Sequence, residues 1–229
     1  MPDLGVGTIV DVSATYESCE KVLALAGKYP HVYAAIGVHP DEVGELNEDK
    51  IQHMKELCCN KKVVAVGEIG LDYYWDNEPH EVQQKWFIRQ LELAGEVKKP
   101  VIIHSREAAA DTMYIMKNYA QGLDGVIHCY SYSREMAEEY VKMGFYIGIG
   151  GVVTFKNAKK LKDVAAAIPI EKIVLETDCP YMAPEPYRGK RNQSSYIRYV
   201  AEKIAELKEM SPEEVIAVTE KNARDLYGI

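Results

Sequence analysis

The sequence predicts an α/β fold of consecutive βα units, and in particular a TIM-type (β/α) barrel. Three observations predict it. Short runs rich in Val and Ile alternate with longer amphipathic stretches along the whole chain, which is typical of a parallel sheet with helical connections. The runs are continuously apolar, as expected for strands that helices cover on both faces. The length of 229 residues is close to the roughly 250 residues of a complete barrel.

Seven runs are expected to form strands, each followed by a helix. They are Gly7–Val12, Val32–His39, Val63–Glu68, Pro100–His104, Gly125–Tyr130, Phe145–Gly150 and Ile173–Asp178. Seven units are one fewer than a full barrel contains. Because the first run begins close to Met1, we expect the first βα unit to be missing. A doubly wound open sheet is the alternative fold and fits seven strands, but no G-x-G-x-x-G segment follows a strand.

Helices are expected between the strands, for example over Tyr16–Lys28 and Val82–Val97, where apolar residues recur on one face. Near the C-terminus, Ser211 followed by Pro212 and Glu214 has the pattern of a helix start with a capping residue. No linker rich in Pro, Gly or Ser and no shift of composition divides the chain. We therefore expect one barrel domain over residues 1–229, incomplete at its N-terminus.

The composition excludes several classes of protein. There are 35 acidic against 27 basic residues, a net charge of −8, which opposes a protein that coats nucleic acid through a broad basic face. No window approaches the roughly 18 consecutive apolar residues of a membrane span. Five cysteines without zinc-finger spacing are interpreted as reduced thiols of a cytoplasmic protein. No obligate protein partner is evident, and soluble enzymes remain the leading class.

Four side chains at strand ends indicate a metal site. Glu68, His104 and Asp178 end their predicted strands, and His128 lies near the end of another. Because the carboxyl ends of barrel strands converge on the active site, these four side chains are expected to meet there. Two imidazoles and two carboxylates form a suitable ligand set for a divalent cation. His39 ends a strand as well, and it either contacts substrate or opens the next helix.

Basic and aromatic residues near these strand ends are candidates for binding a phosphate-containing substrate. Arg106 lies two residues after His104, and its guanidinium could reach a phosphate oxygen. Arg188, Lys190 and Arg191 form a basic cluster after Asp178, which is either a phosphate-binding loop or a solvated one. The aromatic run 73–75 after Glu68 could stack a base or simply pack.

Five motifs resemble those of one known family. They are GEIGLDYY (67–74), PVIIHSR (100–106), VIHCYS (126–131), ETDCPYM (176–182) and RGKRN (188–192). In this order and spacing they resemble the TatD family of metal-dependent deoxyribonucleases, and the likeness covers nearly the whole chain. The resemblance implies an amidohydrolase-like TIM barrel, one or two divalent ions (Mg, Mn or Zn), and hydrolysis of phosphodiester bonds in DNA. It also implies that Glu68 bridges the ions, that His104 and His128 bind one, and that Asp178 binds the other or positions the attacking water.

One family feature is not found in this sequence. The family pattern opens with a strand carrying Asp-x-His-x-His, whereas the first histidine here is His31 and no His-x-His occurs. A start assigned too late, a shortened chain and a real loss of the unit are the competing explanations. We expect the ion that needs those histidines to be bound weakly or to be absent. Two alternative functions remain: a metal-dependent hydrolase of a small ester, lactone or amide, and an inactive, truncated scaffold.

Overall fold

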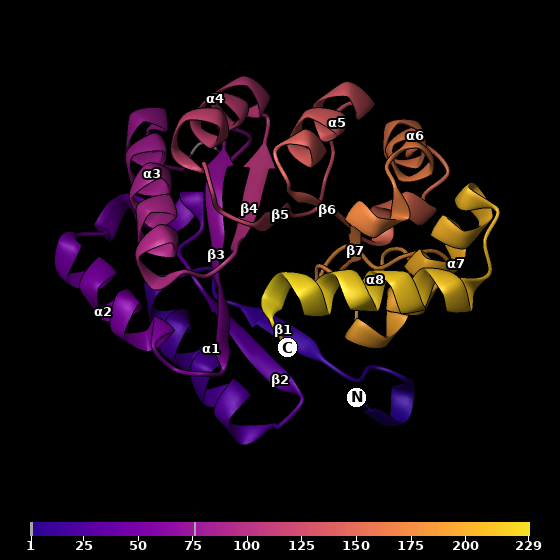
Figure 1. The fold of residues 1–229 in the computed structure, drawn as a ribbon, viewed down its shortest axis with the longest axis horizontal. Helices are drawn as coiled ribbons and strands as arrows, with labels where there is room; N and C mark the ends of the chain where they lie inside the picture. Colours follow the sequence, from indigo (N-terminus) through magenta and orange to yellow (C-terminus); the bar gives the residue numbers. More distant parts are fainter. Residues whose placement is uncertain (1, 76) are drawn as a thin grey trace. The chain divides into compact units, whose positions relative to one another are not determined.

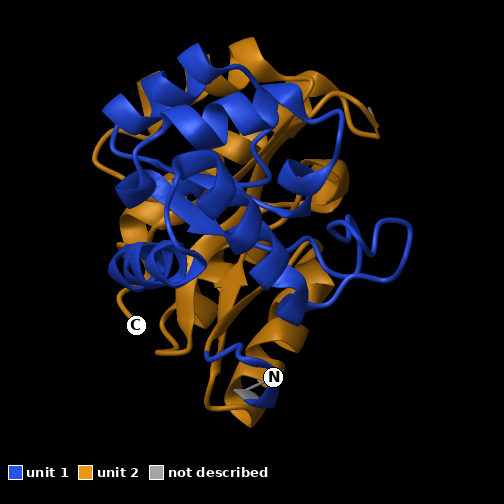
Figure 2. Ribbon diagram, turned by 90° about the vertical axis from the view of Figure 1, so that its right-hand side faces the viewer, with its two compact units in different colours: residues 1–7, 126–226 blue, residues 8–125, 227–229 orange. Residues whose placement is uncertain are grey.

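A computed structural model of the chain describes residues 2–75 and 77–229. The contacts within it group the chain into two compact units, coloured separately in Figure 2. Unit 1 contains the N-terminal residues up to Gly7 and Val126–Leu226, and unit 2 contains Thr8–Gly125 and the last three residues. The expectation of a single domain stays a prediction.

Unit 2 contains a parallel sheet of four consecutive strands, drawn in indigo to magenta in Figure 1. The strands are β1 (Ile9–Val12), β2 (Val32–Ile36), β3 (Val63–Asp72) and β4 (Val101–Arg106). The helices of this unit are α1 (Tyr16–Lys28), α2 (Glu48–Cys58), α3 (His80–Val97), α4 (Ala109–Tyr119) and the 3-10 helix η2 (Pro40–Glu45). Each strand pairs with the next one in the chain, without the reversal of order that a doubly wound sheet requires.

Unit 1 continues the same alternation of parallel strands and helices. Its strands are β5 (Gly125–Ile127, which begins at the last residue of the neighbouring unit's segment), β6 (Tyr146–Ile149) and β7 (Ile173–Leu175), again paired in sequence order. Its helices are α5 (Arg134–Lys142), α6 (Lys159–Ala167), α7 (Ile197–Lys208) and α8 (Pro212–Tyr227). Short 3-10 helices complete the described chain: η1 (Pro2–Leu4), η3 (Gly151–Thr154), η4 (Ile170–Lys172) and η5 (Ser194–Tyr196).

The core explains why the strand sequences are continuously apolar. In unit 2, Ile69 and Leu71 of β3 and Ile103 of β4 are fully buried, and Phe87 of α3 is buried with them. In unit 1, Tyr140 of α5 and the strand residues Ile147 and Ile149 are equally inaccessible. Burial of this apolar surface is the main favourable contribution to folding.

Several sequence predictions are confirmed. Seven parallel strands occur among the described residues, and α1 has the predicted bounds Tyr16–Lys28. Helix α8 begins at Pro212, and Ser211 and Glu214 cap it reciprocally: the Glu214 amide donates to Ser211 Oγ, and the Ser211 amide donates to Glu214 Oε2. Within the described part of the chain, no helix combines the length and the apolar character that crossing a bilayer requires.

The predicted strand ends are wrong in both directions. Strand β3 continues four residues past Glu68 to Asp72, and its ladder with β4 pairs Gly70 with His104. Gly70 has φ +147°, and a Cβ there would lie 1.9 Å from the His104 carbonyl oxygen, so glycine allows the close approach. Conversely, β5 ends at Ile127 and β7 ends at Leu175, before the predicted ends Tyr130 and Asp178.

Candidate metal centre

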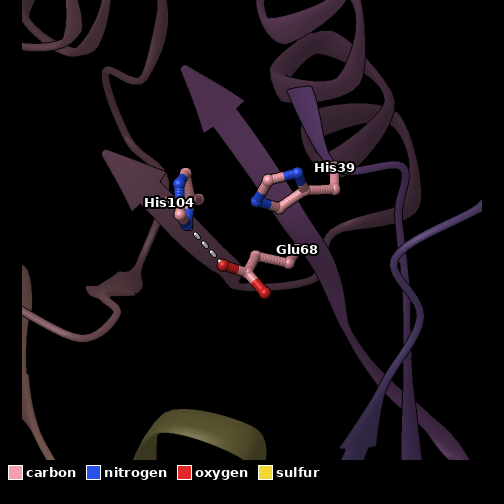
Figure 3. A group of neighbouring side chains, drawn as sticks. All are labelled: His39, Glu68 and His104. Atoms are coloured by element: carbon pink, nitrogen blue, oxygen red, sulfur yellow. Dashed lines mark hydrogen bonds and ion pairs between the residues drawn. The ribbon is translucent and has the colours of Figure 1, made fainter. Parts of the chain in front are cut away.

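Three side chains of unit 2 form a group with the donor atoms of a metal site. His39, Glu68 and His104 each offer one ligand atom, and these atoms all lie within 4.8 Å of one another. Figure 3 shows the three side chains directed toward a common point. His104 Nδ1 lies 2.8 Å from Glu68 Oε1, and the rings of His39 and His104 meet edge to face with centroids 4.3 Å apart.

Neighbouring elements of the sheet hold these three residues. Glu68 lies inside β3, where its amide donates to the Ser13 carbonyl oxygen at 3.1 Å. His104 lies inside β4, the next strand. His39 follows β2 and is the N-terminal cap of η2, its Nδ1 accepting the Asp41 amide at 3.3 Å. His39 thus opens the next helix, which is one of the two roles considered for it from the sequence, and it also belongs to the donor group. Its contact with substrate stays a prediction.

Asp72, at the end of β3, holds the other nitrogen of His104. Its Oδ2 lies 2.9 Å from His104 Nε2, and the side chain is only 1% exposed. Its Oδ1 accepts the backbone amides of Tyr74 at 2.9 Å and Trp75 at 3.2 Å. Burial alone would raise the pKa of Asp72, but the hydrogen bond from His104 and these amides outweigh burial and hold the pKa below its ordinary value. Asp72 is therefore a buried, ionised carboxylate with both oxygens engaged.

Asp41 provides a further carboxylate beside this group. One of its oxygens joins His39 and Asp72 in a second set of donor atoms within 4.8 Å of one another. Burial, followed by the charge of Asp72, raises the pKa of Asp41 to about 6. Its Oδ1 is buried without a hydrogen-bond partner. Carboxylates whose pKa is raised by burial in this way are common at functional sites.

Unit 1 contains a second histidine–carboxylate group. His128 follows β5, and its Nδ1 lies 2.8 Å from Glu176 Oε2. Its Nε2 lies 3.4 Å from Asp178 Oδ1. Glu176 Oε1 also accepts the Cys129 amide at 2.5 Å, and Cys129 has φ +44°, an unusual conformation for a residue other than glycine. The backbone turn at Cys129 thus brings its amide to the same carboxylate that bonds His128.

Arg106 is placed beside the donor group of unit 2. It pairs with Asp72 across the β3–β4 ladder, and its guanidinium carbon lies 3.8 Å from the centroid of the Tyr74 ring. Tyr74 and Trp75 are 55% and 59% exposed. Tyr73 differs: its ring stacks on His80, and its hydroxyl donates to Asp111 at 2.8 Å. Tyr73 is therefore a packing residue, and the two aromatic residues after it face solvent.

The basic cluster of unit 1 lies in an exposed loop next to the segment that follows Asp178. Arg188, Lys190 and Arg191 are all exposed, and the Arg188 guanidinium rests 4.3 Å from the centroid of Phe155. The following residue, Asn192, is 3% exposed. Its amide donates to the Pro180 carbonyl and its side chain donates to the Tyr181 carbonyl. Asn192 thus ties the basic loop to the chain just after Asp178.

The structure brings the predicted metal ligands together in two pairs, Glu68 with His104 in unit 2 and His128 with Asp178 in unit 1. That all four share one ion cluster stays a prediction. Asp41, Asp72 and Glu176 were missed from the sequence. Asp72 had a signal, since the apolar run continues through Ile69 and Leu71 and ends at this carboxylate. Glu176 lies two residues before Asp178 and carried no separate signal.

The donor set fits a divalent metal. Imidazole nitrogen and carboxylate oxygen are the usual ligands of Zn, Mn and related ions. Glu68 and the Nδ1 of His104 face the same point, and the remaining nitrogen of His104 is already bonded to Asp72. A histidine that ligates a metal commonly donates its other N–H to a carboxylate. In unit 2, His104 has this arrangement, with Glu68 at Nδ1 and the carboxylate of Asp72 at Nε2.

The comparisons with known proteins agree with this chemistry. A sequence model of the family described as TatD related DNase matches residues 2–228. The uncharacterized metal-dependent hydrolase YabD of Bacillus subtilis is 46% identical over 98% of this chain and 88% of its own length. The chain belongs to the TatD family. Its members among the relatives are named metal-dependent hydrolases, and this protein is a metal-dependent hydrolase of that family.

Solved TatD structures confirm the fold class. The crystal structure of YjjV, a TatD homologue from Escherichia coli, superposes with a TM-score of 0.92 at 33% identity, covering 99% of this chain and 88% of that one. A TatD family hydrolase from Entamoeba histolytica gives a TM-score of 0.88 at 26% identity, over 98% of this chain and 86% of that one. The predicted TIM-like α/β architecture is therefore correct.

Proposed function

We propose that this TatD protein hydrolyses phosphodiester bonds in DNA with the help of a divalent cation. The observation that carries the proposal is the donor group of His39, Glu68 and His104, found in a chain whose family is described as DNase-related. The residues that would hold the ion are Glu68 and His104 in unit 2, with His128 and Asp178 as the further predicted ligands. When bound, a divalent cation supplies Lewis acidity toward a phosphate and toward an attacking water.

The chain's own carboxylates and histidines have separate tasks in this reaction. Asp178 is 38% exposed, so water can reach its carboxylate. In our proposal Asp178 orients the attacking water and accepts its proton, as a general base does. Glu68, 18% exposed and bonded to His104, would hold the cation through its carboxylate oxygens.

Substrate binding is assigned to the basic side chains. Arg106, Arg188 and Arg191 would contact phosphate oxygens, with Lys190 adding charge to the same loop. Contacts of this kind position a backbone but carry little sequence information. The exposed rings of Tyr74 and Trp75 offer faces on which an unpaired base can stack. We therefore propose little base preference.

A strand-degradation assay tests this function. The purified protein is incubated with labelled DNA and Mg, Mn or Zn, alongside Glu68→Ala and, as a matched control, Glu213→Ala at an exposed position of α8. We expect cleavage by the wild type and the control, and a loss of at least about 100-fold in Glu68→Ala, because removal of a central ligand removes metal-assisted catalysis. Unchanged cleavage by Glu68→Ala would refute the assignment.

A second candidate function keeps the metal donors but replaces DNA by a small ester, lactone or amide. The net charge of −8 favours it, since an acidic protein repels polyanions. Joint neutralisation of Arg188, Lys190 and Arg191 distinguishes the two. A nuclease loses activity on DNA in this variant, whereas a hydrolase of small neutral substrates keeps its activity on an aryl ester. The five free thiols support a reducing, cytoplasmic location for either function.

A further inference from the structure

Each of the two histidines predicted to bind metal lies between two carboxylates, one at each ring nitrogen. The better buried carboxylate is at Nε2 of His104 but at Nδ1 of His128. Asp72 Oδ2 lies 2.9 Å from Nε2 of His104, and Glu68 lies at its Nδ1. Glu176 Oε2 lies 2.8 Å from Nδ1 of His128, and Asp178 lies on the side of its Nε2. In both cases the predicted ligand, Glu68 or Asp178, lies at the ring nitrogen opposite the better buried carboxylate.

Asp72 is fixed so that it cannot turn away from His104. Its second oxygen accepts two backbone amides, those of Tyr74 and Trp75. Its own amide donates to the Gln83 side chain at 2.9 Å, and Gln83 is fully buried. The two hydrogen bonds to Oδ1 set the direction in which Oδ2 points, and the bond to Gln83 fixes the backbone of Asp72.

Glu176 is fixed in an equivalent way in unit 1. Its Oε1 accepts the Cys129 amide at 2.5 Å. A Cβ at position 148 would lie 2.4 Å from Glu176 Oε2, so the glycine of β6 leaves the space that the carboxylate occupies. The side chain is 15% exposed. The Cys129 amide on one side and Gly148 on the other thus determine which oxygen of Glu176 contacts His128.

A histidine that ligates a metal commonly donates its other ring N–H to a carboxylate, and Asp72 and Glu176 are placed to accept that hydrogen bond, while Glu68 and Asp178 lie at the opposite nitrogens. We propose that Asp72 and Glu176 are positioning residues that select Nδ1 of His104 and Nε2 of His128 as the nitrogens that bind metal. This inference rests on the metal site of the proposed function, and it is independent of the substrate.

Two isosteric variants test the inference without removing volume. In Asp72→Asn, the amide oxygen can still accept the amides of Tyr74 and Trp75, while the NH₂ group faces Nε2 and forces the proton of His104 onto Nδ1. In Glu176→Gln, the NH₂ group in the same way forces the proton of His128 onto Nε2. Matched controls are Asp111→Asn, which alters a carboxylate bonded to Tyr73 and Gln84, and Glu214→Gln at the start of α8.

The first measurement is the dissociation constant for Zn²⁺, obtained by competition with a chromophoric chelator. We expect each positioning variant to bind about 10–100-fold more weakly than the wild type, which is the usual effect of losing such a partner, and the two controls to bind normally. Wild-type affinity in both Asp72→Asn and Glu176→Gln overturns the inference.

The second measurement is the proton position on each ring, from NMR of Zn²⁺-loaded protein labelled with ¹⁵N-histidine. The wild type should carry its proton on Nε2 of His104 and on Nδ1 of His128. The reverse pattern in the wild type overturns the inference, whether or not the variants fold. Absence of Zn²⁺ binding by the wild type overturns it together with the proposed function. Normal Zn²⁺ binding and proton positions without DNA cleavage refute only the proposed substrate.

Discussion

Glu68 and His104 are separated by 36 residues in the chain, and their side chains meet at 2.8 Å. Sequence reasoning predicted that both are functional because each was expected at the end of an apolar run. It missed Asp72, despite the apolar run that ends there, and Glu176, because their hydrogen bonds to histidines 32 and 48 residues away are not visible in the sequence. At the scale of single residues, the residue types of the site were predictable and their bonding partners were not.

The cysteines give a test of the environment of single residues. Cys58 is buried, and burial raises the pKa of its thiol to about 12, whereas the neighbouring Cys59 is exposed. Only the thiolate reacts with iodoacetamide. At pH 8, below the pKa of Cys58, we expect rapid alkylation of Cys59 and none of Cys58 in the folded protein. Peptide mass spectrometry measures both, and equal labelling of the two residues would show that Cys58 is not buried.

The exposed aromatic residue Trp75 gives a test of substrate binding. Trp75 is 59% exposed, and the guanidinium of Arg106 lies 5.5 Å from the centroid of its ring. We expect Trp75→Ala to weaken binding of single-stranded DNA by about 1–3 kcal/mol, the contribution of stacking one base. Fluorescence anisotropy in EDTA measures binding without cleavage. Tyr114→Ala, at a 65% exposed position of α4, is the control, and an equal effect of both variants argues against stacking at Trp75.

At the scale of elements, apolar periodicity and capping residues predicted where strands and helices lie, but not where strands end. Helix α1 has the bounds predicted from its apolar periodicity, and the structure adds a capping box of Thr15 and Ser18 at its start. Strand β3 extends to Asp72 because Gly70 permits a close approach to His104. The close approach involves His104 of the neighbouring strand, so the sequence around Gly70 alone does not predict the length of β3. Strand ends were consequently the least predictable feature.

The capping box of α1 can be tested by its effect on stability. The Thr15 hydroxyl oxygen accepts the Ser18 amide at 3.1 Å, and the Ser18 hydroxyl oxygen accepts the Thr15 amide at 2.9 Å. We expect Thr15→Ala to lower the free energy of unfolding by about 0.5–2 kcal/mol. Urea denaturation followed by circular dichroism measures it. Ser131→Ala, at an exposed position outside any helix, should have little effect, and equal losses in both variants would contradict the role of the cap.

At the scale of the whole molecule, the sequence predicted the fold class, the family and the number of strands. The order of motifs along the chain carried that information, and the match to the YjjV structure over 99% of the chain confirms the fold. The prediction that four residues form one ion cluster also requires the distances between strands far apart in the sequence, which the order of motifs does not give. The net charge of −8 also acts at this scale, and it favours cations over polyanions.

Metal binding should stabilise the whole protein. A ligand that binds only the folded state adds about 2.7 kcal/mol of stability at a concentration 100 times its dissociation constant. We therefore expect Mn²⁺ or Zn²⁺ to raise the Tm of the wild type, EDTA to reverse the increase, and Glu68→Ala to show a much smaller one. Differential scanning calorimetry measures the three values. An identical increase in Glu68→Ala would mean that the stabilising ion binds elsewhere.

The most direct test of the central claim is a crystal structure with Mn²⁺, located by its anomalous scattering. We predict a peak at bonding distance from a Glu68 carboxylate oxygen and from Nδ1 of His104, with His128 and Asp178 bound to the same or a second ion. A fully occupied Mn²⁺ that contacts none of these four residues, or no ion at saturating Mn²⁺, would contradict the account.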